Sequence, residues 1–278
     1  MIDAVRRFLF EQLDIRGAMV TLGNAWHEMH AGRDDPPAVT ALLGELAAVT
    51  ALIAGNLKTP GRLTFQLQGH GLVSLLLVDC DEQLRLRGTA RLRDGVAVPP
   101  QPTFKELLGD GQLVLTLQTN YGDPYQSIVP LSGSSITEVF EHYLAQSEQQ
   151  PTRLYLNADE NFAGGLFLQK LPDADAKDPD GWNRIQILAD TLQPAEMLET
   201  IPALLMKLFP EEDIRLFDPR PVRYHCPRDE EKVLAMLKSL GRAEVEAALA
   251  EQGEIAVEDD ICRQHYRYGA DVVRRLFD

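Results

Sequence analysis

Cysteine is scarce in this chain, with three residues among 278. A disulfide framework needs more than that, and so few cysteines suit a protein of a reducing compartment. Basic residues are also in deficit, because 27 Lys and Arg stand against 42 Asp and Glu and leave a net charge of -15. A surface that binds phosphates is basic, so the composition argues against a nucleic-acid partner.

The chain also lacks a long uninterrupted apolar run and a recognisable leader. Its strongest apolar stretch, residues 72–78, is far shorter than the roughly 20 residues that a bilayer-spanning helix needs. Residues 1–14 carry acids and do not show the basic tip and apolar run of a secretory signal. We therefore expect a cytoplasmic protein without a membrane partner.

Motifs of nucleotide-binding and hydrolytic proteins are missing as well. The chain has no G-x-x-x-x-G-K-[ST] phosphate loop and no G-x-S-x-G nucleophile elbow. The sequence G-H-G at 69–71 lacks the third glycine of a dinucleotide fingerprint. These absences predict that the protein is not an enzyme and uses no nucleotide.

Apolar residues make up 45% of the chain, which is enough to bury a large core. Up to residue 172 the pattern predicts an α+β domain with a mostly antiparallel sheet. The apolar positions Ile2, Val5, Leu9 and Leu13 have helical spacing, so residues 2–13 are predicted to be a helix. Further helices are expected at 38–56, 103–109 and 134–147, and strands at 15–22, 63–68, 73–78, 84–91, 113–118, 125–130, 153–157 and 164–170. The last hairpin before 134 would turn at N-Y-G-D-P, residues 120–124.

The composition changes after residue 172. Residues 172–182 are acidic and contain Pro and Gly, which is typical of a linker. Helices are predicted at 182–192 and 195–208, followed by chain breaks between 210 and 221. The final segment, 222–278, is predicted to be a small α+β domain with a strand at 222–225, helices at 229–240 and 242–252, two further strands and a terminal helix.

Short blocks along the chain resemble the redox-regulated 33-kilodalton heat-shock chaperones, in the family's order and over nearly the whole length. The main block is L-T-F-Q-L-Q-G-H-G at 63–71. The others are F-L-F-E at 8–11, R-G at 16–17, L-K at 57–58, R-G-T-A-R at 87–91, Y-Q at 125–126, Y-L-A-Q-S-E-Q-Q-P-T-R at 143–153 and A-G-G-L-F-L-Q at 163–169.

The resemblance implies an N-terminal α+β domain (1–172), a metastable helical linker (173–221) and a small zinc-ribbon-like C-terminal domain (222–278). It also implies an ATP-independent holdase, which binds unfolding proteins under oxidative or heat stress, prevents their aggregation and forms a homodimer on activation. The missing nucleotide motifs agree with this function.

The resemblance further implies a zinc-binding redox switch, of which this chain keeps half. The family holds zinc with Cys-x-Cys and, about thirty residues later, Cys-x-x-Cys. Oxidation of those thiolates releases the metal and loosens the domain and the linker. Here Cys226 and Cys262 match, but Arg228 and Asp259 stand at the other two positions. Arginine cannot ligate a metal, so the remaining candidate zinc ligands are Cys226, Cys262, Asp259 and His265.

The opposite charges of Arg228 and Asp259 support a second interpretation, in which an ion pair takes the place of the metal. Such a pair contributes roughly 0–1 kcal/mol, against roughly 10–16 kcal/mol for a structural zinc. Cys226 and Cys262 would then either form one disulfide on oxidation, beside a cation that favours the thiolate, or persist as inert thiols. In both cases we expect weaker redox control than in four-cysteine relatives, with heat as the stronger trigger.

Client proteins are expected to bind apolar side chains of the linker that pack on the core at rest and are uncovered when the linker moves. The candidates are Trp182, Ile185, Leu188, Leu192, Met197, Leu198, Ile201 and Leu205, together with Ile187, Leu204 and Leu208. Two other functions stay open: a constitutive client-binding module with a decayed switch, and a thiol oxidoreductase, although no Cys-x-x-Cys is present. Cys80, in V-D-C-D-E, is interpreted as a loop thiol.

Overall fold

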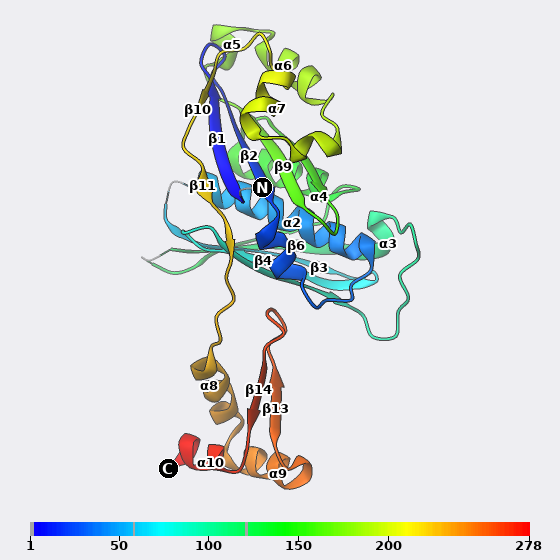
Figure 1. The fold of residues 1–278 in the computed structure, drawn as a ribbon, viewed down its shortest axis with the longest axis vertical. Helices are drawn as coiled ribbons and strands as arrows, with labels where there is room; N and C mark the ends of the chain where they lie inside the picture. The colour runs from blue at the N-terminus through cyan, green and yellow to red at the C-terminus, as the bar shows by residue number, and fades with distance from the viewer. Residues whose placement is uncertain (1–2, 58, 120–121) are drawn as a thin grey trace. The chain divides into compact units, whose positions relative to one another are not determined.

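The computed structural model describes residues 3–57, 59–119 and 122–278. Its contacts divide the chain into two compact units, unit 1 (Met1–Tyr224) and unit 2 (His225–Asp278) (Figure 1). Both units combine helices with strands, which confirms the predicted α+β class. The predicted linker, 173–221, lies within unit 1, so its independent movement stays a prediction.

Two six-stranded sheets form the frame of unit 1. The first sheet has the order β10-β1-β2-β9-β8, with β11 also paired to β1, and all its pairs are antiparallel. The second has the order β12-β5-β4-β3-β6-β7 and is antiparallel except between β12 and β5. The strands are β1 Ala4–Phe10, β2 Ile15–Leu22, β3 Gly61–Gly69, β4 Val73–Cys80, β5 Arg85–Leu92, β6 Gly111–Thr119, β7 Tyr125–Pro130, β8 Thr152–Ala158, β9 Ala163–Lys170, β10 Ile214–Leu216, β11 Arg220–Pro221 and β12 Arg223–Tyr224.

Helix α2 (Pro37–Asn56) lies between the two sheets and is buried on nearly all sides (Figure 1). It begins at a proline, which is favourable at the first helical position. Gly44 lets the helix approach the first sheet closely, since a Cβ there would lie 2.5 Å from the Cβ of Ala158. By length and composition α2 also passes as a membrane span, but 72% of that stretch is buried inside the fold. Its apolar surface therefore forms the main core.

The predicted helix at 2–13 is wrong, because Ala4–Phe10 forms strand β1. Both faces of this strand are covered: Val5 packs toward α2, whereas Phe8 and Phe10 belong to a second apolar cluster on the other face. A strand buried on both faces has apolar residues at odd and even positions, which hides the period of two. Ile2, the first position of the predicted helical stripe, lies outside the described residues.

Most other predicted elements of unit 1 are confirmed. The turn residues Asn120 and Tyr121 and the Lys58 of the L-K block lie outside the described residues. Strands β10 and β11 were missed in the segment predicted as chain breaks, because strands of two or three residues give no periodicity and depend on pairing with β1. The remaining helices are α1 Asn24–His30, α3 Phe104–Leu108, α4 Ile136–Glu148, α5 Ala174–Lys177, α6 Gly181–Ala189, the 3-10 helix η1 Pro194–Leu198 and α7 Ile201–Leu208.

The helix predicted at 195–208 is two helices, η1 and α7. Glu199 and Thr200 between them are extended, with ψ of 163° and 138°. Pro202 at the start of α7 cannot donate the backbone hydrogen bond that a continuous helix would require of it. The break between η1 and α7 leaves the Leu198 side chain, at the end of η1, 47% exposed.

Unit 2 has its own apolar core beneath a hairpin. Its elements are α8 Glu230–Leu240, α9 Arg242–Gln252, β13 Ile255–Glu258, β14 His265–Tyr268 and α10 Asp271–Phe277. The core consists of Val233, Leu237, Val245, Ile255, Tyr266, Tyr268, Val272 and Leu276. The predicted strand at 222–225 shrinks to β12, which pairs with β5 within unit 1. The sequence thus predicted the three helices and the hairpin of unit 2, but not that β12 pairs within unit 1 or that two tyrosines are buried in the core of unit 2.

Candidate functional site

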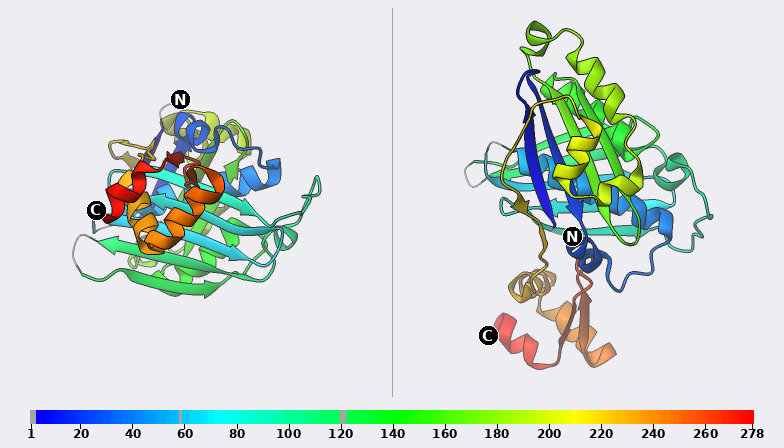
Figure 2. Two further views of the ribbon diagram at one scale, coloured as in Figure 1. Left: turned by 90° about the horizontal axis from the view of Figure 1, so that it is seen from below. Right: turned by 45° about the horizontal axis from the view of Figure 1, so that its top comes forward.

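A helical layer, defined here as residues 181–209, covers one face of the first sheet (Figures 1 and 2). The layer contributes Ile185, Ala189, Leu204, Leu205, Leu208 and Phe209 to a buried apolar cluster. Within it they pack with Phe8, Phe10, Leu13, Ile15, Met19, Leu166 and Leu168. The rings of Phe209 and Phe10 meet edge-on with 5.0 Å between their centroids. This cluster is distinct from the larger core around α2. The contact between the helical layer and the sheet is therefore separate from the main core.

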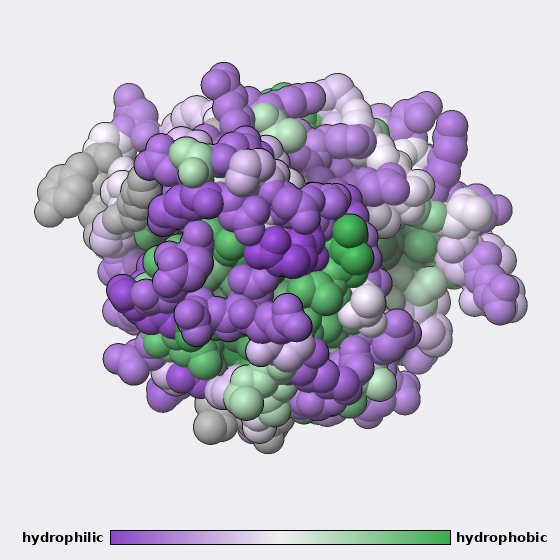
Figure 3. Space-filling model, turned by 90° about the horizontal axis from the view of Figure 1, so that it is seen from above, coloured by the Kyte–Doolittle hydropathy of each residue, from purple (hydrophilic) through white to green (hydrophobic). Residues whose placement is uncertain are grey.

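The predicted client-binding residues lie in or beside this layer. Ile185, Met197 and Leu205 are buried, and Leu198 is 47% exposed. Trp182, Leu188, Leu192 and Ile201 are half-buried against the same cluster. Sequence reasoning missed Phe209, which is buried in this cluster and directly follows the predicted helix end at residue 208. Met206 on α7 is 74% exposed. Figure 3 looks onto this end of unit 1 and shows apolar surface between polar side chains.

A groove of about 380 Å³ runs along the edge of the helical layer. One wall consists of Ala4, Arg6 and Thr21 from β1 and β2, and the other of residues 198–202 and Pro219. The groove is mostly apolar, and the extended break between η1 and α7 forms its rim. Apolar surface is thus already accessible next to the covered face.

Polar contacts hold the helical layer only weakly. Arg184 bridges Asp178 and Glu212 at 3.0 and 2.9 Å, and the Tyr155 hydroxyl donates to Asp190 at 2.6 Å. Ion pairs that solvent still reaches contribute roughly 0–1 kcal/mol each. The apolar cluster therefore provides most of the attachment.

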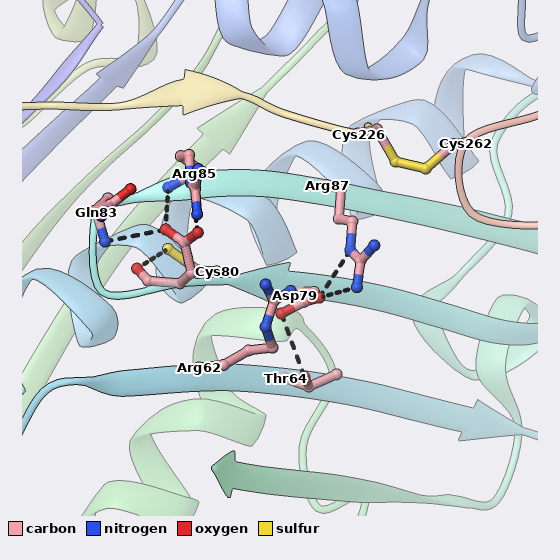
Figure 4. A network of polar contacts seen from close by, with 10 residues as sticks. Arg62, Thr64, Asp79, Cys80, Gln83, Arg85, Arg87, Cys226 and Cys262 are labelled. Atoms are coloured by element: carbon pink, nitrogen blue, oxygen red, sulfur yellow. Dashed lines mark hydrogen bonds and ion pairs between the residues drawn. A yellow bond between two sulfur atoms is a disulfide. The ribbon is translucent and has the colours of Figure 1, made fainter. Parts of the chain in front are cut away.

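A network of buried acids and partly exposed arginines lies on the second sheet (Figure 4). The Asp79 carboxylate accepts from Arg62 at 2.6 Å and from Arg87 at 2.8 Å. Between Asp79 and Asp81, Cys80 ends β4 with none of its surface exposed, so the loop-thiol interpretation is wrong. Burial raises the pKa of the Cys80 thiol well above its ordinary value. Cys80 is therefore a structural core residue and not a redox centre.

In unit 2, Cys226 and Cys262 form a disulfide with a Cα–Cα distance of 6.0 Å. It joins the segment that precedes α8 to the turn between β13 and β14. The Gln264 amide donates to the Cys226 carbonyl at 2.6 Å, and the buried Tyr266 hydroxyl accepts from the Asp229 backbone N–H at 2.9 Å. We call these residues, together with Arg228, the junction. The two cysteines thus lie side by side, as predicted, and the structure joins them in a disulfide.

The predicted Arg228–Asp259 ion pair is not formed among the described residues, because both side chains have other partners. The Arg228 guanidinium donates to the His265 carbonyl at 3.0 Å and lies 4.6 Å from the centre of the Tyr266 ring. The Asp259 carboxylate accepts from the backbone N–H groups of Ile261 and Cys262 at 2.9 and 2.8 Å. A short acidic side chain at a turn bonds its own backbone more readily than a distant cation.

Comparison with known proteins shows the family of this chain. Residues 3–269 match the family model described as Hsp33 protein. The chain belongs to the Hsp33 family. Proteins named 33 kDa chaperonin are similar to this Hsp33 protein along their length: that of Methylobacillus flagellatus is 40% identical over 282 residues and that of Nitrosococcus oceani is 40% identical over 277, each alignment covering 99% of this chain and 94% of the relative. The predicted chaperone class is thereby confirmed.

The fold of this Hsp33 protein also matches a solved structure. A crystal structure of the 33 kDa chaperonin (heat shock protein 33 homologue) of Thermotoga maritima agrees with a TM-score of 0.84 and 19% identity, covering 99% of this chain and 98% of that one. At this identity the likeness shows the fold alone.

The junction of this Hsp33 protein fits a zinc ion poorly. Both cysteines are consumed by the disulfide, and a disulfide sulfur is not the thiolate that zinc binds. The Asp259 carboxylate is held by its own turn, and the His265 side chain is 70% exposed beside Glu258. Within residues 3–57, 59–119 and 122–278, no cluster of three or more His, Cys, Asp or Glu side chains is arranged to hold a metal.

Proposed function

We propose that this Hsp33 protein is an ATP-independent holdase, whose client-binding surface is the contact between the helical layer and the first sheet. The observation that carries the proposal is the separate apolar cluster under residues 181–209. Lifting the layer would uncover large apolar side chains on both partners, including Phe8 and Phe10 on the sheet and Leu204 on the layer. Unfolding proteins expose apolar segments of the same chemistry, so such a surface binds them without ATP.

Heat is the proposed trigger, because the layer lies on the outside of the first sheet and is held by a small apolar cluster that is separate from the main core. The layer therefore belongs to the parts of the protein that open at a lower free energy than the main core. We further propose a cytoplasmic location and a homodimeric active form, in which uncovered apolar surface is shared between two copies.

Light scattering of a heat-denatured client protein tests the proposed function. We expect the chain to suppress scattering without ATP after brief heating and to have little effect before it. Suppression of equal strength before heating would instead identify a constitutive binding module. Turnover of disulfide substrates without suppression would identify a thiol oxidoreductase and reject the holdase.

We also propose that the chain works without a structural zinc. Only two thiols are present at the four family positions, and Arg228 stands at a third. We expect protein purified under reducing conditions to contain well below one zinc per chain by elemental analysis, and its thermal unfolding to be unchanged by a strong chelator. One tightly held zinc per chain would contradict this proposal.

A further inference from the structure

The disulfide in unit 2 closes a loop that contains most of that unit. Cys226 and Cys262 are 36 residues apart, and α8, α9 and β13 lie between them. A cross-link across a loop of this size removes many conformations from the unfolded chain. By this effect alone the ratio of folded to unfolded unit 2 rises on the order of 100-fold or more.

We propose that oxidation stabilises unit 2 in this protein, and that reduction or heat loosens it. This effect of oxidation on stability is opposite to the one implied by the resemblance to four-cysteine chaperones. In those proteins oxidation removes a metal that holds the domain together. The Arg228 side chain bonds the His265 carbonyl, and the Asp259 carboxylate bonds the backbone of its own turn. Oxidation therefore takes no ligand away from unit 2 and adds a covalent bond.

The bond forms by exchange with a low-molecular-weight disulfide, RSSR. One cysteine thiolate attacks RSSR, forms a mixed disulfide and releases RS⁻. The second thiolate displaces the other RS⁻, and the two protons lost by the cysteines convert both leaving groups to RSH. Cys226 and Cys262 are each partly exposed, so small thiols and disulfides can reach them in both directions.

The rest of the junction keeps the two cysteines close after reduction. The hydrogen bond from Gln264 to the Cys226 carbonyl, the contact between Tyr266 and the Asp229 N–H, and the stacking of Arg228 on Tyr266 do not depend on the sulfur atoms. The apolar core of unit 2 is also independent of them. Reduction should therefore lower the stability of unit 2 without unfolding it at rest, and oxidant should restore the bond.

Amide hydrogen exchange on the full chain tests the proposal. One sample is oxidised with glutathione disulfide and the other is reduced with dithiothreitol, and exchange is followed by mass spectrometry on peptides from α8, β13 and β14. We expect the slowest amides of these elements to exchange at least about tenfold faster in the reduced sample. Equal rates in the two samples, or slower exchange after reduction, would overturn the proposal.

Two variants separate the disulfide from general effects of the reagents. Cys226→Ser should exchange at the fast rate in both buffers, because it cannot form the bond. Cys80→Ser, which changes the buried cysteine of unit 1, should keep the full difference between the buffers in unit 2. A Cys226→Ser chain that still responds to the reagents would also overturn the proposal.

The consequence for client binding rests on the proposed holdase function and has its own readout. The reduced chain should begin to suppress client scattering at a temperature about 10 °C lower than the oxidised chain. Suppression in neither state, together with the exchange difference, would reject the holdase function and still support the stabilising disulfide. An exchange difference without a shift in activation temperature would overturn the regulatory role.

Discussion

Replacing Phe209 with alanine is expected to make the chain suppress client aggregation without heating. Phe209 is 1% exposed and anchors the end of α7 against Phe10 of β1. Removal of a buried phenylalanine side chain costs about 3–5 kcal/mol, which is a large part of what can hold a small peripheral layer on a sheet. Because the cluster is separate from the core around α2, this loss should open the helical layer and leave the sheets folded.

Hydrogen exchange in α6 and α7, measured together with client scattering, checks the Phe209→Ala prediction. The matched control is Met206→Ala on the same helix, because Met206 is 74% exposed and its truncation should change stability by less than about 0.5 kcal/mol. If exchange shows the layer open in Phe209→Ala and the client still aggregates, the covered face is not the client-binding surface.

Replacing Glu45 with glutamine should raise the free energy of unfolding by about 3 kcal/mol at about pH 8, and have almost no effect at about pH 4. Glu45 lies on α2 between the two sheets, and burial raises its pKa from 4.5 to about 7. An acid with a raised pKa in the folded state binds its proton more tightly there. The native chain therefore loses stability as the pH rises from 4.5 to about 7, whereas the glutamine variant does not ionise.

Urea denaturation followed by tryptophan fluorescence measures the Glu45 effect, since Trp26 is fully buried in the same core as α2. Glu160→Gln, at an exposed position between β8 and β9, is the control for the loss of one negative charge. If the variant gained the same stability at both pH values, the difference between glutamate and glutamine would come from side-chain shape and not from ionisation. No gain at the higher pH would contradict the raised pKa.

The patterns that depend on local residue order predicted the fold well. Strand β2 matches its predicted bounds, and β3 shows clean alternation because one face packs on α2 and the other is more open. The same reasoning failed for β1, where both faces are covered, and for β10 and β11, which exist only through pairing with β1. Local patterns report one-sided burial, but they do not report which distant segment covers the second face.

For the candidate site, the amino-acid sequence alone determined the chaperone family, the half-complete cysteine motif and the apolar helices after residue 172. Tertiary structure decided which partners the key side chains take. Asp259 bonds the backbone of its own turn and Arg228 stacks on Tyr266, so the expected ion pair is replaced by a disulfide junction. Phe209 becomes an anchor only because β1 brings Phe10 beneath it. Contacts between residues far apart in the chain depend on geometry that is created by folding, and no local pattern encodes them.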